Sequence, residues 1–120
     1  MTGKTDILLK YSEDGSNLFV GECKFWRGAS EYHKAIDQLF ERYLTWRDSK
    51  VAVILFVKNK EFTAVIDTIK TETEKHKYFK SFTGNRGESS FSYKFSLPQD
   101  KDKIVYLEVM SFHFDKSKAK

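Results

Sequence analysis

The feature that most constrains the fold is one uninterrupted apolar run, Val51-Ala52-Val53-Ile54-Leu55-Phe56-Val57. A short run of this composition is typical of a strand that is buried on both faces, in a sheet that helices cover. The run is far shorter than the roughly 20 apolar residues that span a bilayer. We therefore expect a globular domain built around this strand, with no membrane partner.

Composition narrows the class of protein further. The chain has 120 residues, of which 40% are hydrophobic and 11 are phenylalanine, enough to form one core and too many for a disordered segment. The single cysteine, Cys23, cannot form an internal disulfide. No charged segment followed by an apolar stretch opens the sequence, so we expect no signal peptide and a cytoplasmic location.

The charge balance permits a nucleic-acid partner without requiring one. There are 21 basic and 17 acidic residues, for a net charge of +4. Part of this excess lies in a basic tail, residues 115–120, which holds three lysines and one aspartate. We expect one domain over residues 1–120 that ends in this tail.

Hydrophobic periodicity and turn residues predict the order of secondary structure. A turn over residues 12–17 separates two strand-like segments and indicates a hairpin. The predicted elements are strands 5–11 and 18–26, helix 30–47, strand 51–57, helix 61–76, loop 83–88 and strands 91–97 and 104–114. This order predicts an α/β fold with a mixed central sheet, flanking helices and a C-terminal β-hairpin.

The second strand carries two charges on a face that begins apolar. Alternation places Glu22 and Lys24 on the same face, and Cys23 on the other. Burying these charges is costly unless they pair with each other or bind a metal ion. An ordinary ion pair at the end of a strand is the alternative interpretation.

The register of the predicted hairpin decides whether Asp6 joins these charges. With a three-residue loop, Leu8 lies opposite Val20 and Asp6 lies opposite Glu22, with Cβ atoms about 4.5–5.5 Å apart. A two-residue turn would instead place Asp6 on the other face of the sheet. We favour the three-residue loop.

Two carboxylates this close repel each other unless a cation lies between them. Hard oxygen ligands suit Mg²⁺ or Mn²⁺, which retain waters and accept phosphate oxygens. Lys24 would point towards the same phosphate or towards the attacking water. The pattern of Asp6, Glu22 and Lys24 therefore favours metal-assisted phosphodiester hydrolysis.

The segment Thr5-Asp6-Ile7-Leu8-Leu9, followed by Glu22-Cys23-Lys24, resembles the signature of the PD-(D/E)xK nuclease superfamily, which includes many restriction endonucleases. The resemblance covers residues 4–58. It implies that Asp6 and Glu22 bind the metal, that the Cys23 backbone carbonyl adds a ligand, and that Lys24 assists the water. It also implies a restriction-endonuclease-like fold and a DNA substrate, with RNA as an alternative.

Other positions support the resemblance or depart from it. Gln38 resembles the glutamine that follows the lysine in RecB-like members, although Tyr43 stands one position too far along for their tyrosine. Thr5 replaces the signature proline. The family core also begins with a helix, for which residues 1–4 leave no room, so we expect the chain to be a fragment of a larger protein or a minimal version that lacks this helix.

Several residues flank the predicted site and are expected to contact nucleic-acid phosphates: Lys4, Arg27, His33, Lys34 and Arg42. Specificity would come from a further recognition domain, a partner chain or a homodimer. The alternative function is an inactive nucleic-acid or protein interaction module on the same fold. An exposed aromatic row in the C-terminal hairpin would indicate stacking on single strands or a dimer surface.

Overall fold

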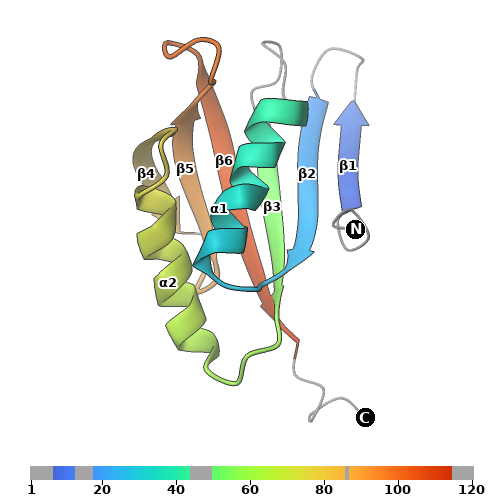
Figure 1. Ribbon diagram of the computed structural model, residues 1–120, viewed down its shortest axis with the longest axis vertical. Helices are drawn as coiled ribbons and strands as arrows, with labels where there is room; N and C mark the ends of the chain where they lie inside the picture. Colours follow the sequence, from blue (N-terminus) through green and yellow to red (C-terminus); the bar gives the residue numbers. More distant parts are fainter. Residues whose placement is uncertain (1–6, 13–17, 44–49, 86, 115–120) are drawn as a thin grey trace.

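The fold is a mixed six-stranded sheet that carries two helices (Figure 1). The computed structural model describes residues 7–12, 18–43, 50–85 and 87–114, and gives no side-chain environments for residues 7–12, 18–20, 42 and 43. The strands are β1 (Ile7–Ser12), β2 (Leu18–Phe25), β3 (Lys50–Val57), β4 (Phe79–Asn85), β5 (Ser90–Ser96) and β6 (Ile104–His113). The helices are α1 (Ala29–Gln38), which continues as the π-helical segment η2 (Leu39–Tyr43), and α2 (Phe62–Glu74).

The strands follow the order β1-β2-β3-β6-β5-β4 across the sheet. The centre is parallel, because β2, β3 and β6 run in the same direction. Both sides are antiparallel, where β1 pairs with β2 and where β4 and β5 extend the sheet beyond β6. The predicted α/β class and mixed sheet are therefore confirmed.

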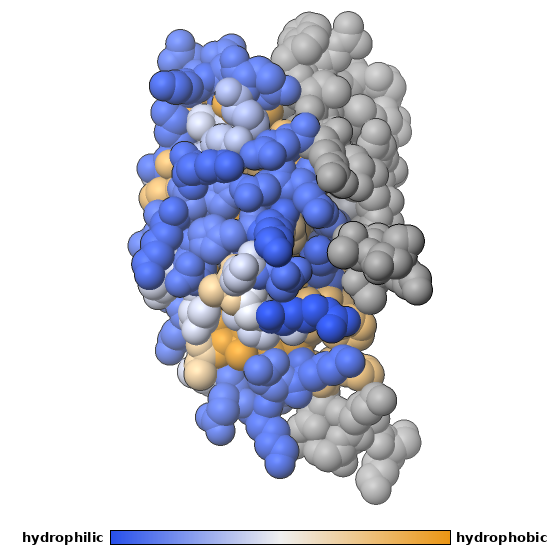
Figure 2. Space-filling model, viewed as in Figure 1, coloured by the Kyte–Doolittle hydropathy of each residue, from blue (hydrophilic) through white to orange (hydrophobic). Residues whose placement is uncertain are grey.

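The two helices lie on the same face of the sheet (Figure 1). Tyr32, Ile36 and Phe40 recur at helical spacing along α1 and η2, and their side chains are buried. They pack in one core with α2 residues such as Ile69 and with the inward residues of the strands. The outer surface of the helices is mostly hydrophilic (Figure 2).

The central strand β3 shows how the sheet divides into two faces. Val51, Val53, Leu55 and Val57 are buried under the helices and belong to the core. The intervening side chains point to the opposite side, which we call the open face; there Ile54 and Phe56 are partly exposed. Among the described residues, no helix covers this open face.

Three of the sequence expectations are corrected by the structure. The loop predicted over residues 83–88 is wrong for its first three residues, because β4 extends to Asn85, whereas Gly87 and Glu88 lie outside any strand or helix as predicted. Helix α1 begins at Ala29 and changes to π-helical hydrogen bonding at Leu39, while residues 44–47 of the predicted helix lie outside the described residues. The three-residue hairpin loop is also wrong, because Ser12 pairs with Leu18 and the predicted partner of Ser12 is Ser16.

Candidate active site

Glu22 lies at the centre of β2, where it pairs with Leu8 of β1 on one side and Val53 of β3 on the other. Val53 belongs to the helix-covered core, so Glu22 points to the same side of the sheet. The residue is only 1% exposed. A carboxylate in such a position carries a large desolvation cost, which proteins accept mainly where the group is paired or has a function.

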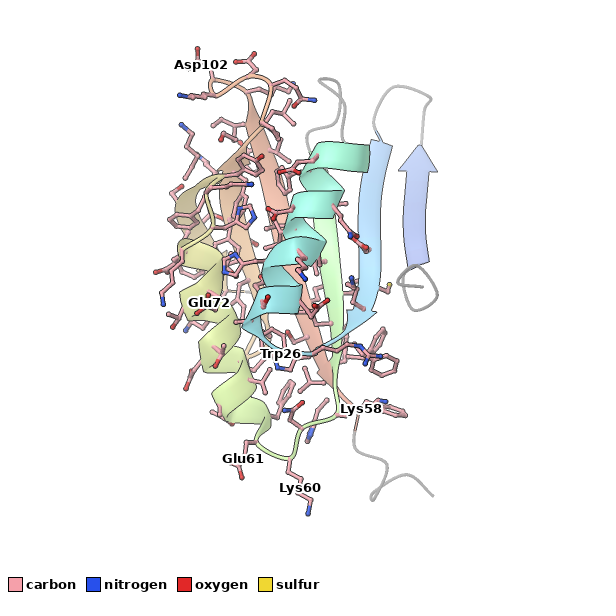
Figure 3. All side chains as sticks on the ribbon, viewed as in Figure 1. Trp26, Lys58, Lys60, Glu61, Glu72 and Asp102 are labelled. Atoms are coloured by element: carbon pink, nitrogen blue, oxygen red, sulfur yellow. The ribbon has the colours of Figure 1, made fainter. Side chains whose placement is uncertain are left out.

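Lys24 follows on the same face of β2, opposite Leu55. It is partly exposed and borders a small cavity where the end of β2 meets the first turns of α1. Residues from β2, from the turn that follows it, from β3 and from α1 line this cavity: Lys24, Phe25, Trp26, Arg27, Glu31, Tyr32, Ala35 and Leu55. Figure 3 labels Trp26 at this junction, and the exposed Arg27 adds a second positive charge there.

The chain enters α1 through a tight turn that fixes the position of these cationic groups. Gly28 precedes the helix with a φ of 105°, which is unfavourable for residues that carry a Cβ. The Trp26 N–H donates to the Phe56 carbonyl at 2.9 Å, which ties the end of β2 to β3. Lys24 and Arg27 are therefore held at the parallel ends of β2 and β3.

The two other predicted metal ligands are Asp6 and the backbone carbonyl of Cys23. The expected pairing of Asp6 with Glu22 is wrong, because Leu8 occupies the position opposite Glu22. Asp6 and Lys4 lie outside the described residues, as does the side chain of Arg42. The Cys23 side chain points to the open face, and burial together with the Glu22 charge raises the pKa of its thiol, which argues against a nucleophilic role.

Gln38 ends α1 with a partly buried side chain. The two remaining predicted phosphate contacts lie near the other end of this helix. Lys34 is exposed and its Nζ atom is 3.4 Å from Glu31 Oε2. His33 points towards α2, where its Nε2 atom is 2.8 Å from Glu72 Oε1.

His33 belongs to a polar seam between the helices that the sequence analysis did not anticipate. Its ring stacks on that of His76, with the centroids 5.4 Å apart and the planes inclined by 7°. His76 Nε2 is 2.8 Å from Asp37 Oδ1 on α1. Figure 3 shows Glu72 on α2, the partner of His33. These pairs join residues 39 positions apart, so no local sequence pattern could reveal them.

The hydrogen bonds of His76 define its protonation state. The backbone N–H of Tyr78 donates to His76 Nδ1 at 3.1 Å, so this nitrogen carries no proton and the Nε2–H donates to Asp37. Burial lowers the pKa of His76, although Asp37 acts in the opposite direction. The hydrogen bond from His33 lowers the pKa of Glu72. This seam is a structural contact between the helices in which His76 is neutral.

A second and larger cavity, of about 410 Å³, lies away from Glu22 and Lys24. It is bordered by Lys50, Ser92, Tyr106 and Glu108. These residues lie near the N-terminal end of β3, whereas Leu55 lies near its C-terminal end. We base the candidate active site on the buried Glu22 and its neighbour Lys24, because chemistry depends on suitably placed charges and not on cavity size alone.

Comparison with known proteins does not assign the chain to a family: no family model, curated protein or solved structure matches it. Within the described part of the chain, no group of three or more His, Cys, Asp or Glu side chains is arranged to hold a metal ion. None of the described helices is long and apolar enough to cross a membrane.

Proposed function

We propose that the chain is a restriction-endonuclease-like domain that hydrolyses phosphodiester bonds in DNA with the help of Mg²⁺ or Mn²⁺. The observation that carries this proposal is the placement of Glu22 and Lys24 on one face of β2, between antiparallel β1 and parallel β3. The β1–β2 hairpin that holds these residues is followed by helix α1 and then by the parallel strand β3. This is the order that the resemblance to PD-(D/E)xK nucleases implies. This arrangement supports the resemblance beyond the short signature itself.

The residues present fit a divalent cation in their chemistry. Glu22 supplies a carboxylate that is removed from solvent, and Asp6, two positions before the Leu8 that pairs with Glu22, would supply the second. The Cys23 backbone carbonyl would add a further oxygen. When bound, the metal ion would lower the pKa of a water molecule and polarise the phosphoryl oxygen.

Lys24 and its neighbours would act on the substrate directly. The Lys24 ammonium would orient the attacking water and stabilise the negative charge that develops on the phosphate. Gln38 would assist from the end of α1. Arg27 is exposed beside Lys24, where it can contact a neighbouring phosphate of the nucleic-acid backbone.

The proposal is tested by incubating the chain with labelled single- and double-stranded DNA and RNA in Mg²⁺ or Mn²⁺. We expect cleavage by the wild type and a loss of at least about 100-fold in Glu22→Gln and in Lys24→Met. The matched control is Glu108→Gln, which changes a carboxylate on the open face. Cleavage that all variants retain, or none by a folded wild type, would contradict the proposal; metal-independent DNA binding without cleavage would favour an interaction module.

A further inference from the structure

The open face of the sheet carries a continuous set of apolar side chains. In register across β2, β3 and β6, Phe25 pairs with Phe56 and Phe56 pairs with Phe112. The next pairs along the strands join Cys23 to Ile54 and Ile54 to Met110. Both helices lie on the other side of the sheet (Figure 1).

The aromatic rings of this face form one cluster at the end of the parallel strands. The Phe56 centroid is 5.8 Å from that of Phe25 and 6.1 Å from that of Phe112. Phe114 joins the cluster, 6.1 Å from Phe25. Phe112 is 50% exposed and Phe114 is 41% exposed.

This exposure is unusual for the centre of a parallel sheet. Strands such as β3 are normally covered on both faces, because both sets of side chains are apolar. Ile54 and Phe56 are nevertheless partly exposed on the open face. Contiguous apolar patches of this kind mark sites of association on soluble proteins.

The distribution of residue types matches a protein interface. Phenylalanine, isoleucine and methionine occupy the half of the face at the C-terminal ends of β3 and β6, whereas Lys50, Lys94 and Glu108 lie in the other half. Lys50 and Lys94 flank the exposed Tyr106 at one end. At the other end, Lys58 Nζ lies 4.4 Å from the centroid of the Phe25 ring. Aromatic residues and methionine are enriched at protein–protein contacts, and here they are grouped in one half of an exposed sheet face.

We infer that the open face binds a second copy of this chain, so that two sheets pack face to face in a twofold dimer. The open face spans the four neighbouring strands β2, β3, β6 and β5. With a spacing of about 4.8 Å between strands and a strand length of about 26 Å, its area is about 500 Å². Two such surfaces bury about 1,000 Å², which is at the lower limit for a specific interface and indicates a weak dimer. Single-stranded nucleic acid fits the face less well, because Glu108 lies between Tyr106 and Phe112 on β6.

The charges favour one orientation of the two copies. A twofold axis perpendicular to the strands places Lys50 and Lys94 of each copy over the Phe56 and Phe112 rings of the other, where cation–π contacts form. An axis along the strands would set the lysine-bearing ends of the two faces against each other, which is repulsive. We therefore expect the strands of the two copies to run antiparallel.

This inference does not depend on the proposed nuclease function. Glu22 and Lys24 lie on the helix-covered side of β2, whereas Cys23 and Phe25 contribute to the open face. A dimer through the open face would leave the candidate active site of each copy uncovered.

Sedimentation equilibrium of the wild type tests the inference directly. Between about 10 and about 300 µM we expect the mass to rise from 14.1 kDa towards twice that value, as for a weak interface. Phe112→Lys and Phe114→Lys should each weaken dimerisation by at least about 10-fold, because they remove an aromatic ring and place a positive charge at the end that faces Lys50 and Lys94 of the other copy. Both residues are substantially exposed, and circular dichroism verifies that the variants fold.

Phe82→Lys is the matched control. Phe82 is similarly exposed, at 42%, but its ring contacts Tyr93, whose buried side chain points to the helix side. Its substitution should leave dimerisation unchanged. A wild type that stays at 14.1 kDa, or equal dimerisation of all variants, would overturn the inference. It would also be overturned if the monomer bound oligo(dT) through Phe112.

Discussion

The neutral state of His76 makes the stability of the domain depend on pH. In the folded protein the buried ring accepts the Tyr78 N–H at Nδ1, donates to Asp37 from Nε2 and stacks on His33. A second proton on Nδ1 would remove the hydrogen bond from Tyr78 and add a positive charge beside Lys77, whose proximity also lowers the pKa of His76. In the unfolded chain the same ring titrates near 6.5.

The sign of the pH effect follows from this difference. The folded-state pKa of His76 is lowered, so below pH 6.5 the unfolded chain binds more protons than the folded one. The free energy of unfolding should therefore be highest above pH 6.5 and fall as the pH decreases through the folded-state pKa. One group can contribute at most about 1.4 kcal/mol per pH unit in this interval.

Urea denaturation between about pH 5 and about pH 7.5, followed by tryptophan fluorescence, measures this slope. His76→Phe is the matched variant, since the ring of His76 already packs among aromatic rings. Its centroid is 5.5 Å from that of Phe95 and 5.2 Å from that of Tyr78. The variant should lose about 1–3 kcal/mol at pH 7.5, where the Tyr78 N–H has no acceptor, and should show a smaller slope. Equal slopes in the two proteins, or a wild type that gains stability on acidification, would refute the reasoning.

Three further substitutions test the core. Phe40→Ala should lower the free energy of unfolding by about 3–5 kcal/mol, because Phe40 is fully buried against Phe95. Tyr32→Phe should cost only about 1 kcal/mol: it removes a 2.5 Å hydrogen bond to Thr73, whose hydroxyl still donates to a backbone carbonyl. Ser111→Ala should stabilise by about 1 kcal/mol, because no described residue bonds the buried Ser111 hydroxyl. Urea unfolding measures all three, and a change of opposite sign would contradict the packing described.

The sequence was most informative where one residue pattern dominates. The apolar run over residues 51–57 predicts a central strand that is buried on both faces. Strand β3 occupies Lys50–Val57 at the centre of the sheet, but burial on both faces is wrong for Ile54 and Phe56, which are partly exposed on the open face. The helical spacing over residues 61–76 predicts α2, which spans Phe62–Glu74. In both segments burial and local preference favour the same structure, so the pattern alone is sufficient.

The sequence was least informative where local pattern is absent. Strand β4 has mostly exposed side chains and two register irregularities against β5, so its residues show no alternation of apolar and polar types. The hairpin register also escaped prediction. It depends on the length of the connection after Ser12, for which several turn geometries were compatible with the same polar residues.

The candidate site was predictable only in part, for the same physical reason. Alternation along β2 is sufficient to place Glu22 and Lys24 on one face, as the structure shows. The seam that joins His33 to Glu72 and His76 to Asp37 depends on how two helices pack. The exposure of Phe112 depends on which face the helices cover, and the order of elements along the chain does not determine this.

The most direct test of the proposed function is a calorimetric titration of the chain with Mn²⁺ and with Mg²⁺, in the presence of an uncleavable phosphorothioate DNA duplex. We expect saturable metal binding by the wild type and by Glu108→Gln, and binding at least about 10-fold weaker in Glu22→Gln and in Asp6→Asn. Such a result would place both carboxylates at one metal site. Metal binding unchanged by either active-site substitution, or no binding by a folded wild type, would contradict the proposal that this domain is a metal-dependent nuclease.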